Sequence, residues 1–305
     1  NTDIDYSRYK FFYINYLISQ NKFDEIKEIV NEIDTLSSSL LILQLKNWID
    51  NTKFKKITEI FSCKNESDIL SEFFFIIANL YSSEEQYENS NLFLNIANFL
   101  NPKFRFNTSL IVENNFSNKN YKKTKVLLNR FNKKDEIYYW YKIKKITQII
   151  SQESNQEEAI NYINSKFSKI ENPSTKILFD MGNIAKGFKK YKSSINYYDS
   201  VISRIEKNSI TYADLLYRRG GSYERLGKYE ESDKDLLKSL EINQDDAYVL
   251  NYLAYSWLER DYKIDTAIQM LDKAYEQRSN DPYIIDSVGW GYYLVNDFVN
   301  SEKFL

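Results

Sequence analysis

The chain has 305 residues, with 41 Lys and Arg against 43 Asp and Glu, so its formal net charge is only −2. This balance gives no global sign of a nucleic-acid or membrane-surface protein, and the absence of histidine excludes a Ser-His-Asp triad or a histidine-ligated metal within the chain. A single cysteine permits no internal disulfide or cysteine-based zinc site, and only 7 Gly and 3 Pro favour helices over a turn-rich β fold.

A pattern of small and large residues recurs along the chain. A marker residue falls in the middle of the first predicted helix of each period, at Ile14, Leu45, Ala78, Val112, Ile146, Gly182, Gly220, Ala254 and Gly289. Successive markers lie 31, 33, 34, 34, 36, 38, 34 and 35 residues apart. A self-similar period of this length predicts a stack of helical pairs, each too small to bury its apolar face alone.

The pattern varies in strength along the chain. Residues 1–70 and 139–174 match it weakly, whereas residues 71–104 match it almost completely. We therefore expect degenerate units over 1–174 and well-formed units over 175–305, all within one continuous solenoid. The last unit is expected to be truncated, because Leu305 falls at a packing position midway along a second helix, so the natural protein should continue beyond it.

Helix packing explains the pattern. Small residues such as Gly182 and Gly220 in first helices, opposite Ser194 and Ser232 in second helices, let the two helices of a pair approach closely. Large residues such as Trp257 fill the space between neighbouring pairs. Small and large positions therefore specify the same helix–turn–helix unit along the chain.

This pattern resembles the tetratricopeptide repeat, a helix–turn–helix unit of the form W-x2-L-G-x2-Y…A-x3-F…P. The resemblance covers essentially the whole chain. It implies an all-α fold, a right-handed α-solenoid of about nine such units.

Residues 251–298 are similar to a narrower group, the tetratricopeptide-repeat proteins of the bacterial, particularly proteobacterial, cell envelope. The matching residues are Tyr255, Trp257, Ala267, Asp281, Asp286, Ser287, Gly289, Trp290 and Tyr293. The resemblance implies a scaffold or adaptor in the cell envelope or periplasm, with the cytoplasm as the alternative. The sequence begins at Asn1 rather than Met, so we expect a fragment or a processed form. A lipid-bearing cysteine near the N-terminus is not matched, because Cys63 lies deep inside the second unit.

Other chemistry is poorly supported. The segment GNIAKG at 182–187 has the spacing of a phosphate loop but continues with Phe188 and Lys189, not with Lys and Ser or Thr. Paired acidic residues fall where helices begin, which is typical of solvated capping. Cys63 has no histidine to activate it and is expected to be buried or inert. We predict no catalytic residue, metal ligand or cofactor, and an enzyme subunit using carboxylate or lysine chemistry is kept as an alternative.

A basic segment at 119–145 offers a second alternative. It holds ten cations against Asp135 and Glu136, with six aromatic residues between them. Basic residues interleaved with aromatics are typical of surfaces that bind nucleic acid or anionic lipid. The competing interpretation is a solvated lysine-rich face whose aromatics pack in the core.

The resemblance also implies where a partner binds, because five positions of each first helix face the concave groove in this family. In the last three units these positions hold Arg218, Tyr248, Asn251, Tyr252, Tyr255, Tyr283, Asp286, Ser287, Trp290 and Tyr293. Tyr and Trp contribute much of the binding energy at interfaces. We therefore predict a non-enzymatic scaffold that binds a protein or peptide in this groove, with nucleic acid not expected and the oligomeric state left open.

Overall fold

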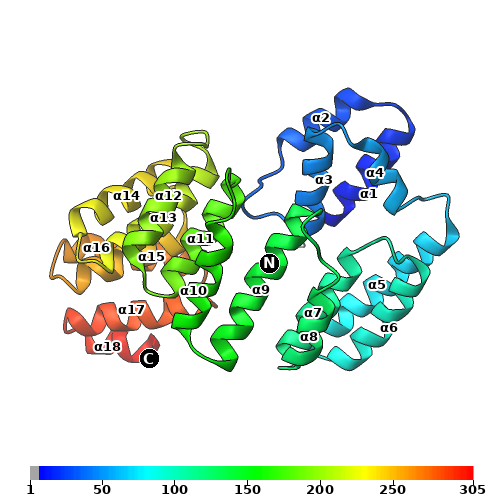
Figure 1. Ribbon diagram of the computed structural model, residues 1–305. Coiled ribbons are helices and arrows are strands. Elements are labelled where there is room, and N and C mark those ends of the chain that lie inside the picture. The colour runs from blue at the N-terminus through cyan, green and yellow to red at the C-terminus, as the bar shows by residue number, and fades with distance from the viewer. Residues whose placement is uncertain (1–6, 305) are drawn as a thin grey trace. The chain divides into compact units, whose positions relative to one another are not determined.

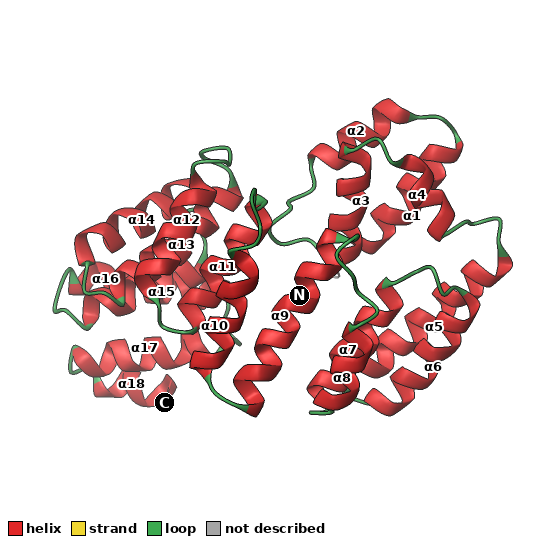
Figure 2. Cartoon of the chain, viewed as in Figure 1, coloured by secondary structure: helices red, strands yellow, loops and turns green. Residues whose placement is uncertain are grey.

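The computed structural model describes residues 7–304, which fold into 18 helices and contain no strand (Figures 1 and 2). Within this range, no helix is both long and apolar enough to span a bilayer. The chain divides into two compact units, residues 1–171 and residues 172–305. The helices form nine successive pairs, so the predicted all-α fold of about nine helix–turn–helix units is confirmed.

The first unit contains five helical pairs. They are α1 (Ser7–Ser19), α2 (Phe23–Asn31), α3 (Leu40–Asp50), α4 (Phe54–Ile60), α5 (Glu66–Ser83), α6 (Tyr87–Leu100), α7 (Phe106–Ser117), α8 (Tyr121–Leu128), α9 (Glu136–Glu153) and α10 (Gln156–Phe167). From α5 onward the second helix of one pair packs against the first helix of the next, as α6 does against α7. The first two pairs differ, because α1 packs against both α3 and α4, and α3 also contacts α9.

The second unit contains four pairs. They are α11 (Thr175–Gly187), α12 (Tyr191–Ile202), α13 (Ile210–Glu224), α14 (Tyr229–Ile242), α15 (Ala247–Leu258), α16 (Ile264–Gln277), α17 (Pro282–Leu294) and α18 (Phe298–Phe304). Each second helix packs against the next first helix, and the first helices α15 and α17 also touch (Figure 1). The first helices of this unit begin at capping residues, as where Asp246 accepts hydrogen bonds from two backbone N–H groups of α15.

The turn inside each pair is as periodic as the helices. In eight of the nine pairs the residue seven positions after the marker has a positive φ, which ends the first helix in the left-handed conformation. These residues are Asn21, Thr52, Glu85, Lys119, Lys189, Gly227, Asp261 and Asn296. The pair α9–α10 lacks this feature among the described residues, and its marker Ile146 is only partly buried.

The other markers lie in the core, as the repeat pattern predicts. Ile14, Leu45, Ala78, Val112 and Ala254 are fully buried, and Gly182, Gly220 and Gly289 are buried as well. The small residues of the second helices are also buried: Ser90, Thr124, Ser194, Ser232 and Ala267 have no exposed surface. Because the marker residues of the first helices and the small residues of the second helices are both buried, they form the close contact within each pair.

Gly182 shows how tight this contact is. A Cβ atom at Gly182 would lie 2.6 Å from Cε1 of Tyr198, and one at Gly220 would lie 3.0 Å from Cγ of Leu236. Real Cβ atoms do not approach carbon atoms as closely as 2.6 Å, so the second helix requires glycine there. The glycine at 182 is therefore a packing residue of α11, and the segment at 182–187 is not a phosphate loop.

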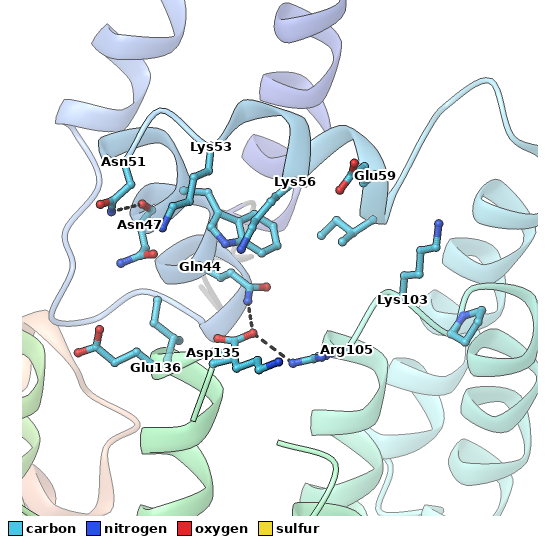
Figure 3. A pocket seen from close by; sticks show the side chains of 15 residues that line it. Gln44, Asn47, Asn51, Lys53, Lys56, Glu59, Lys103, Arg105, Asp135 and Glu136 are labelled. Carbon is cyan, nitrogen blue, oxygen red and sulfur yellow. Dashed lines mark hydrogen bonds and ion pairs between the residues drawn. The ribbon is translucent and has the colours of Figure 1, made fainter. Parts of the chain in front are cut away.

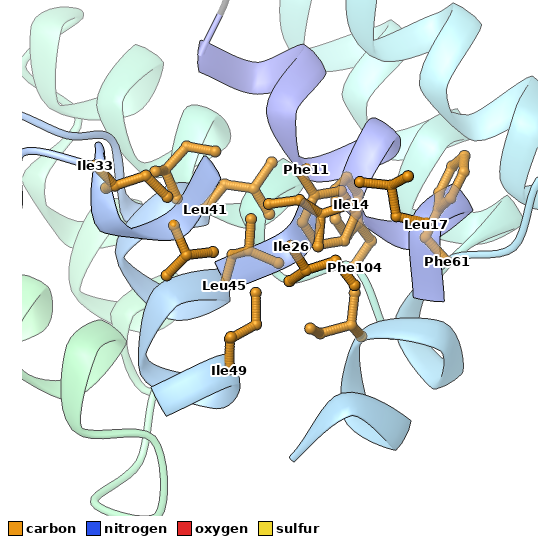
Figure 4. Packing of buried hydrophobic residues seen from close by; sticks show 13 residues of the cluster. Phe11, Ile14, Leu17, Ile26, Ile33, Leu41, Leu45, Ile49, Phe61 and Phe104 are labelled. Atoms are coloured by element: carbon orange, nitrogen blue, oxygen red, sulfur yellow. The ribbon is translucent and has the colours of Figure 1, made fainter. Parts of the chain in front are cut away.

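The first unit has a core of its own, built by α1–α4 and closed by Phe104 from the loop before α7 (Figure 4). Arg8 of α1 connects this core to the next helices. Its guanidinium lies 3.7 Å from the ring centroid of Phe75 and within 6 Å of those of Phe12, Phe104 and Phe106; we call these four rings the Arg8 cage. Arg8 Nε also donates to Glu72 Oε1 at 2.8 Å, and a second hydrogen bond makes the pair bidentate.

Candidate partner-binding surface

The ten residues predicted to bind a partner lie on three first helices of the second unit. Arg218 lies on α13, four residues on α15 and five on α17. Four of the tyrosines are well exposed: Tyr248 by 43%, Tyr255 by 39%, Tyr283 by 79% and Tyr293 by 48%. Ser287 is instead buried, and its Oγ donates to the carbonyl of Tyr283 one turn earlier in the same helix at 2.9 Å.

Aromatic residues of α15 and α17 are held by one carboxylate. Trp290 Nε1 donates to Glu259 Oε1 at 2.8 Å, just beyond the end of α15. Burial and then the Glu259 carboxylate raise the pKa of the Tyr255 hydroxyl. Trp290 also stacks on Tyr293, with centroids 5.3 Å apart and rings 18° from parallel. These contacts fix the rings while leaving part of their surface exposed, which lowers the entropy lost on binding.

A second group of contacts joins α13 to α15. The Tyr252 hydroxyl donates to Glu224 Oε2 at 3.0 Å, and its ring meets Tyr217 edge-on at 5.8 Å. Burial and then Glu224 raise the pKa of the Tyr252 hydroxyl. The preceding residue, Asn251, has a buried Oδ1 that accepts no hydrogen bond from any described residue. A buried acceptor without a donor is unfavourable unless a ligand supplies one.

Arg218 is already paired within the chain. Its Nε donates to Asp214 Oδ2 at 2.8 Å, and its Nη1 reaches Asn183 Oδ1 at 3.4 Å. The guanidinium also lies 5.2 Å from the ring centroid of Phe179. A ligand carboxylate at Arg218 would therefore have to share the guanidinium with Asp214.

Lys186 on α11 is a further residue of this surface that the sequence analysis did not identify. Its Nζ donates to the Arg218 carbonyl at 3.2 Å and lies 2.8 Å from where a Cβ of Gly221 would be. Burial, followed by the charges of Arg218 and Arg225, lowers the pKa of this amine to about 8. Glycine at 221 thus leaves room for a lysine between α11 and α13.

The repeat register itself contains the information needed to find these residues. The sequence analysis names groove residues only in the last three units, and only Arg218 in the first of these three. Counting the same positions back from Gly220 and Gly182 adds Lys176, Phe179, Asp180, Asn183, Lys186, Asp214, Tyr217, Gly221 and Glu224. In this register the candidate positions extend over the four first helices of the second unit, although Phe179 and Asp180 among them are buried.

The basic segment at 119–145 lies in the first unit and does not form an aromatic surface. Phe131, Tyr138, Trp140 and Tyr141 are buried, each less than a tenth exposed. Lys145 is buried as well and pairs with Glu113 at 2.7 Å and with Phe116. Stacking of bases requires accessible rings, and these four aromatic side chains pack in the core instead.

Cys63 departs from expectation in one respect. It was expected to be buried or inert, and it is exposed in the turn between α4 and α5. Among residues 7–304 no group of three or more Cys, Asp or Glu side chains is arranged to hold a metal ion.

Comparison with known proteins matches one of the helical pairs to a known repeat. Residues 213–246, which span α13 and α14, match the family model described as tetratricopeptide repeat. A curated TPR repeat-containing protein of Pseudomonas aeruginosa is 30% identical over 92 residues, which are 30% of this chain and 16% of that protein. The matched region thus spans less than a sixth of the length of this relative.

Solved structures add the likeness in fold. A chain of the APC/C hetero-tetramer Cut9–Hcn1 matches 90% of this chain and 54% of its own length, with a TM-score of 0.52 and 15% identity. A tetratricopeptide repeat protein from Parabacteroides merdae matches 77% of both chains, with a TM-score of 0.44 and 14% identity. The matched repeat at 213–246, the similarity to the bacterial protein and the paired helices agree with the predicted resemblance to tetratricopeptide-repeat proteins.

Proposed function

We propose that this chain is a non-enzymatic scaffold whose second unit binds a peptide or protein on the surface formed by α11, α13, α15 and α17. Tetratricopeptide repeats support a role in protein interaction in general. The observation that carries the finer proposal is the set of exposed aromatic side chains on α15 and α17, which the core does not bury. Such side chains offer large contact area together with a polar group.

The polar groups of the surface suit an extended peptide. The buried Oδ1 of Asn251 lacks a donor among the described residues, and a backbone N–H of a bound peptide would supply one. Tyr248 and Tyr255 on the same helix and Tyr283 on α17 offer exposed rings for apolar side chains. Main-chain hydrogen bonds would then hold the peptide, while the rings select its side chains.

The partner can be identified by site-specific photo-crosslinking in the native cell. A photoreactive phenylalanine analogue placed at Tyr283, which is 79% exposed, is expected to capture a defined protein. The control places the same analogue at Val299 on the second helix α18, which is 72% exposed. Equal capture from both positions would contradict the assignment of the surface.

The captured protein is then purified and titrated against variants of the full chain. We expect Tyr255→Ala and Trp290→Ala each to weaken the affinity by a factor of about 30, and the double variant by up to about 1,000, since each hot-spot residue contributes about 2 kcal/mol. The matched control, Tyr229→Ala with Tyr262→Ala, removes two exposed tyrosines outside this surface and should bind like the parent. Loss of helicity along with binding would show that Tyr255 and Trp290 belong to the core, and unchanged affinity would overturn the proposal.

A further inference from the structure

A polar pocket of about 800 Å³ lies in the first unit (Figure 3). It is lined by α3 and α4, by the loop before α7, and by the start of α9. Lys53 and Lys56 stand on one side of it, and Lys103 and Arg105 on the other. Its volume suits a few residues of a peptide or a small molecule.

The charges of the pocket are unequally paired. Asp135 accepts a hydrogen bond from Gln44 Nε2 at 2.6 Å and lies 3.6 Å from Arg105 Nη1, so these groups satisfy one another. Glu59 also lines the pocket, and its carboxylate lies 3.7 Å from Nζ of Lys55, a residue that does not line it. Glu136 is the remaining acid of the lining.

Four lysines of the pocket have no such partner. Lys53, Lys56, Lys103 and Lys134 are exposed, and none has a carboxylate oxygen within 4 Å among the described residues. They come from three separate segments, the turn and start of α4, the loop before α7 and the loop before α9. Like charges converging on one concave site repel one another, and an anionic ligand relieves that repulsion.

We infer that this pocket binds an acidic segment of a partner protein, with Asp or Glu carboxylates against Lys53, Lys56, Lys103 and Lys134. The cations are separate lysine point charges rather than paired guanidiniums, which suits carboxylates spaced along a peptide better than one compact phosphate. Trp48 also lines the pocket and offers an apolar wall for the peptide's methylene groups. This second site is independent of the proposed aromatic surface of the second unit.

The test uses the full chain and fluorescein-labelled hexaglutamate, followed by fluorescence anisotropy at low salt. We expect saturable binding that weakens as salt rises from about 50 to 300 mM, because exposed charges are screened over about 10 Å at 0.1 M salt. The variant Lys53→Glu with Lys103→Glu is expected to bind at least tenfold more weakly. The control Lys122→Glu with Lys123→Glu changes the net charge equally at exposed positions of α8 and should bind like the parent.

Other outcomes would overturn the inference. Equal loss in the two double variants would show general attraction to lysine, and no binding at low salt would exclude the site. Displacement of hexaglutamate by tripolyphosphate at a much lower concentration would assign the pocket to phosphate instead. Hexaglutamate should also protect Lys53 and Lys103 of the parent from acetylation by an amine reagent, read by mass spectrometry. Tyr255→Ala with Trp290→Ala should bind hexaglutamate normally, so failure of the proposed function and failure of this inference are distinguishable.

Discussion

Replacing Gly182 by alanine tests the close approach of α11 and α12. The new Cβ would lie 2.6 Å from Cε1 and 2.8 Å from Cδ1 of Tyr198, so the ring must move by about 1 Å to reach ordinary contact distance. That ring is fully buried, and its hydroxyl donates to Asn183 Oδ1 at 2.8 Å, on the same helix as Gly182. The ring is therefore held on both sides and cannot move without disturbing α11.

Two opposing terms set the size of the effect. Alanine is favoured over glycine within a helix by about 1 kcal/mol, whereas overpacking a core costs about 1–3 kcal/mol. Because the overlap involves two ring carbons of an anchored tyrosine, we take the upper part of that range. Gly182→Ala is then expected to lower the free energy of unfolding by about 1–2 kcal/mol.

Urea unfolding followed by far-UV circular dichroism measures this change, and hydrogen exchange shows whether it is confined to α11 and α12. Gly187→Ala is the matched control, because it is on the same helix and no atom lies within 4 Å of its Cβ. In a Tyr198→Leu background, adding Gly182→Ala should cost less, because the smaller side chain leaves room. Equal stability of the Gly182→Ala and Gly187→Ala variants would refute the reasoning.

Three further predictions concern buried charges. Arg8→Lys should destabilise the first unit by about 1–2 kcal/mol in urea unfolding, because lysine cannot form the bidentate pair with Glu72; an unchanged midpoint would contradict this. Lys145→Met should lower stability in thermal unfolding, because Glu113 loses its partner; the loss should be only about 1 kcal/mol, because Glu113 stays partly exposed to water. Lys186 has a folded-state pKa near 8, below its ordinary 10.5, so the unfolded chain binds more protons between those values and stability should rise with pH above about 8. The rise should be absent in Lys186→Met when urea midpoints at about pH 7.5 and 9.5 are compared, and equal rises in both proteins would contradict it.

The repeat architecture could be predicted because it depends on contacts close in sequence. A small residue and the turn seven positions later belong to the same pair, so the spacing of the markers predicts both. The pair α9–α10 shows where this fails, since Ile146 is partly buried and the left-handed turn residue is missing. Fully buried Ile149 and Tyr138 carry the packing of α9 instead.

The charged sites could not be predicted in the same way. Arg8 and Glu72 are 64 residues apart, and the polar pocket depends on α3 lying against the start of α9 rather than on any repeat position. The surface of the second unit is intermediate. Its positions follow from the register, but the shared carboxylate of Glu259 and the buried amine of Lys186 depend on how neighbouring repeats meet.

The Arg8 cage has a consequence for the order of folding during synthesis. Phe104 and Phe106 follow Arg8 by about 100 residues, which a ribosome adds in roughly 5–20 s. Pairs such as α5–α6 close over short loops and need no such wait, because loop closure costs less entropy when the ends are near in sequence. The helix α1 is therefore made early and can pack against α2–α4 soon afterwards, but Arg8 acquires the last rings of its cage only later.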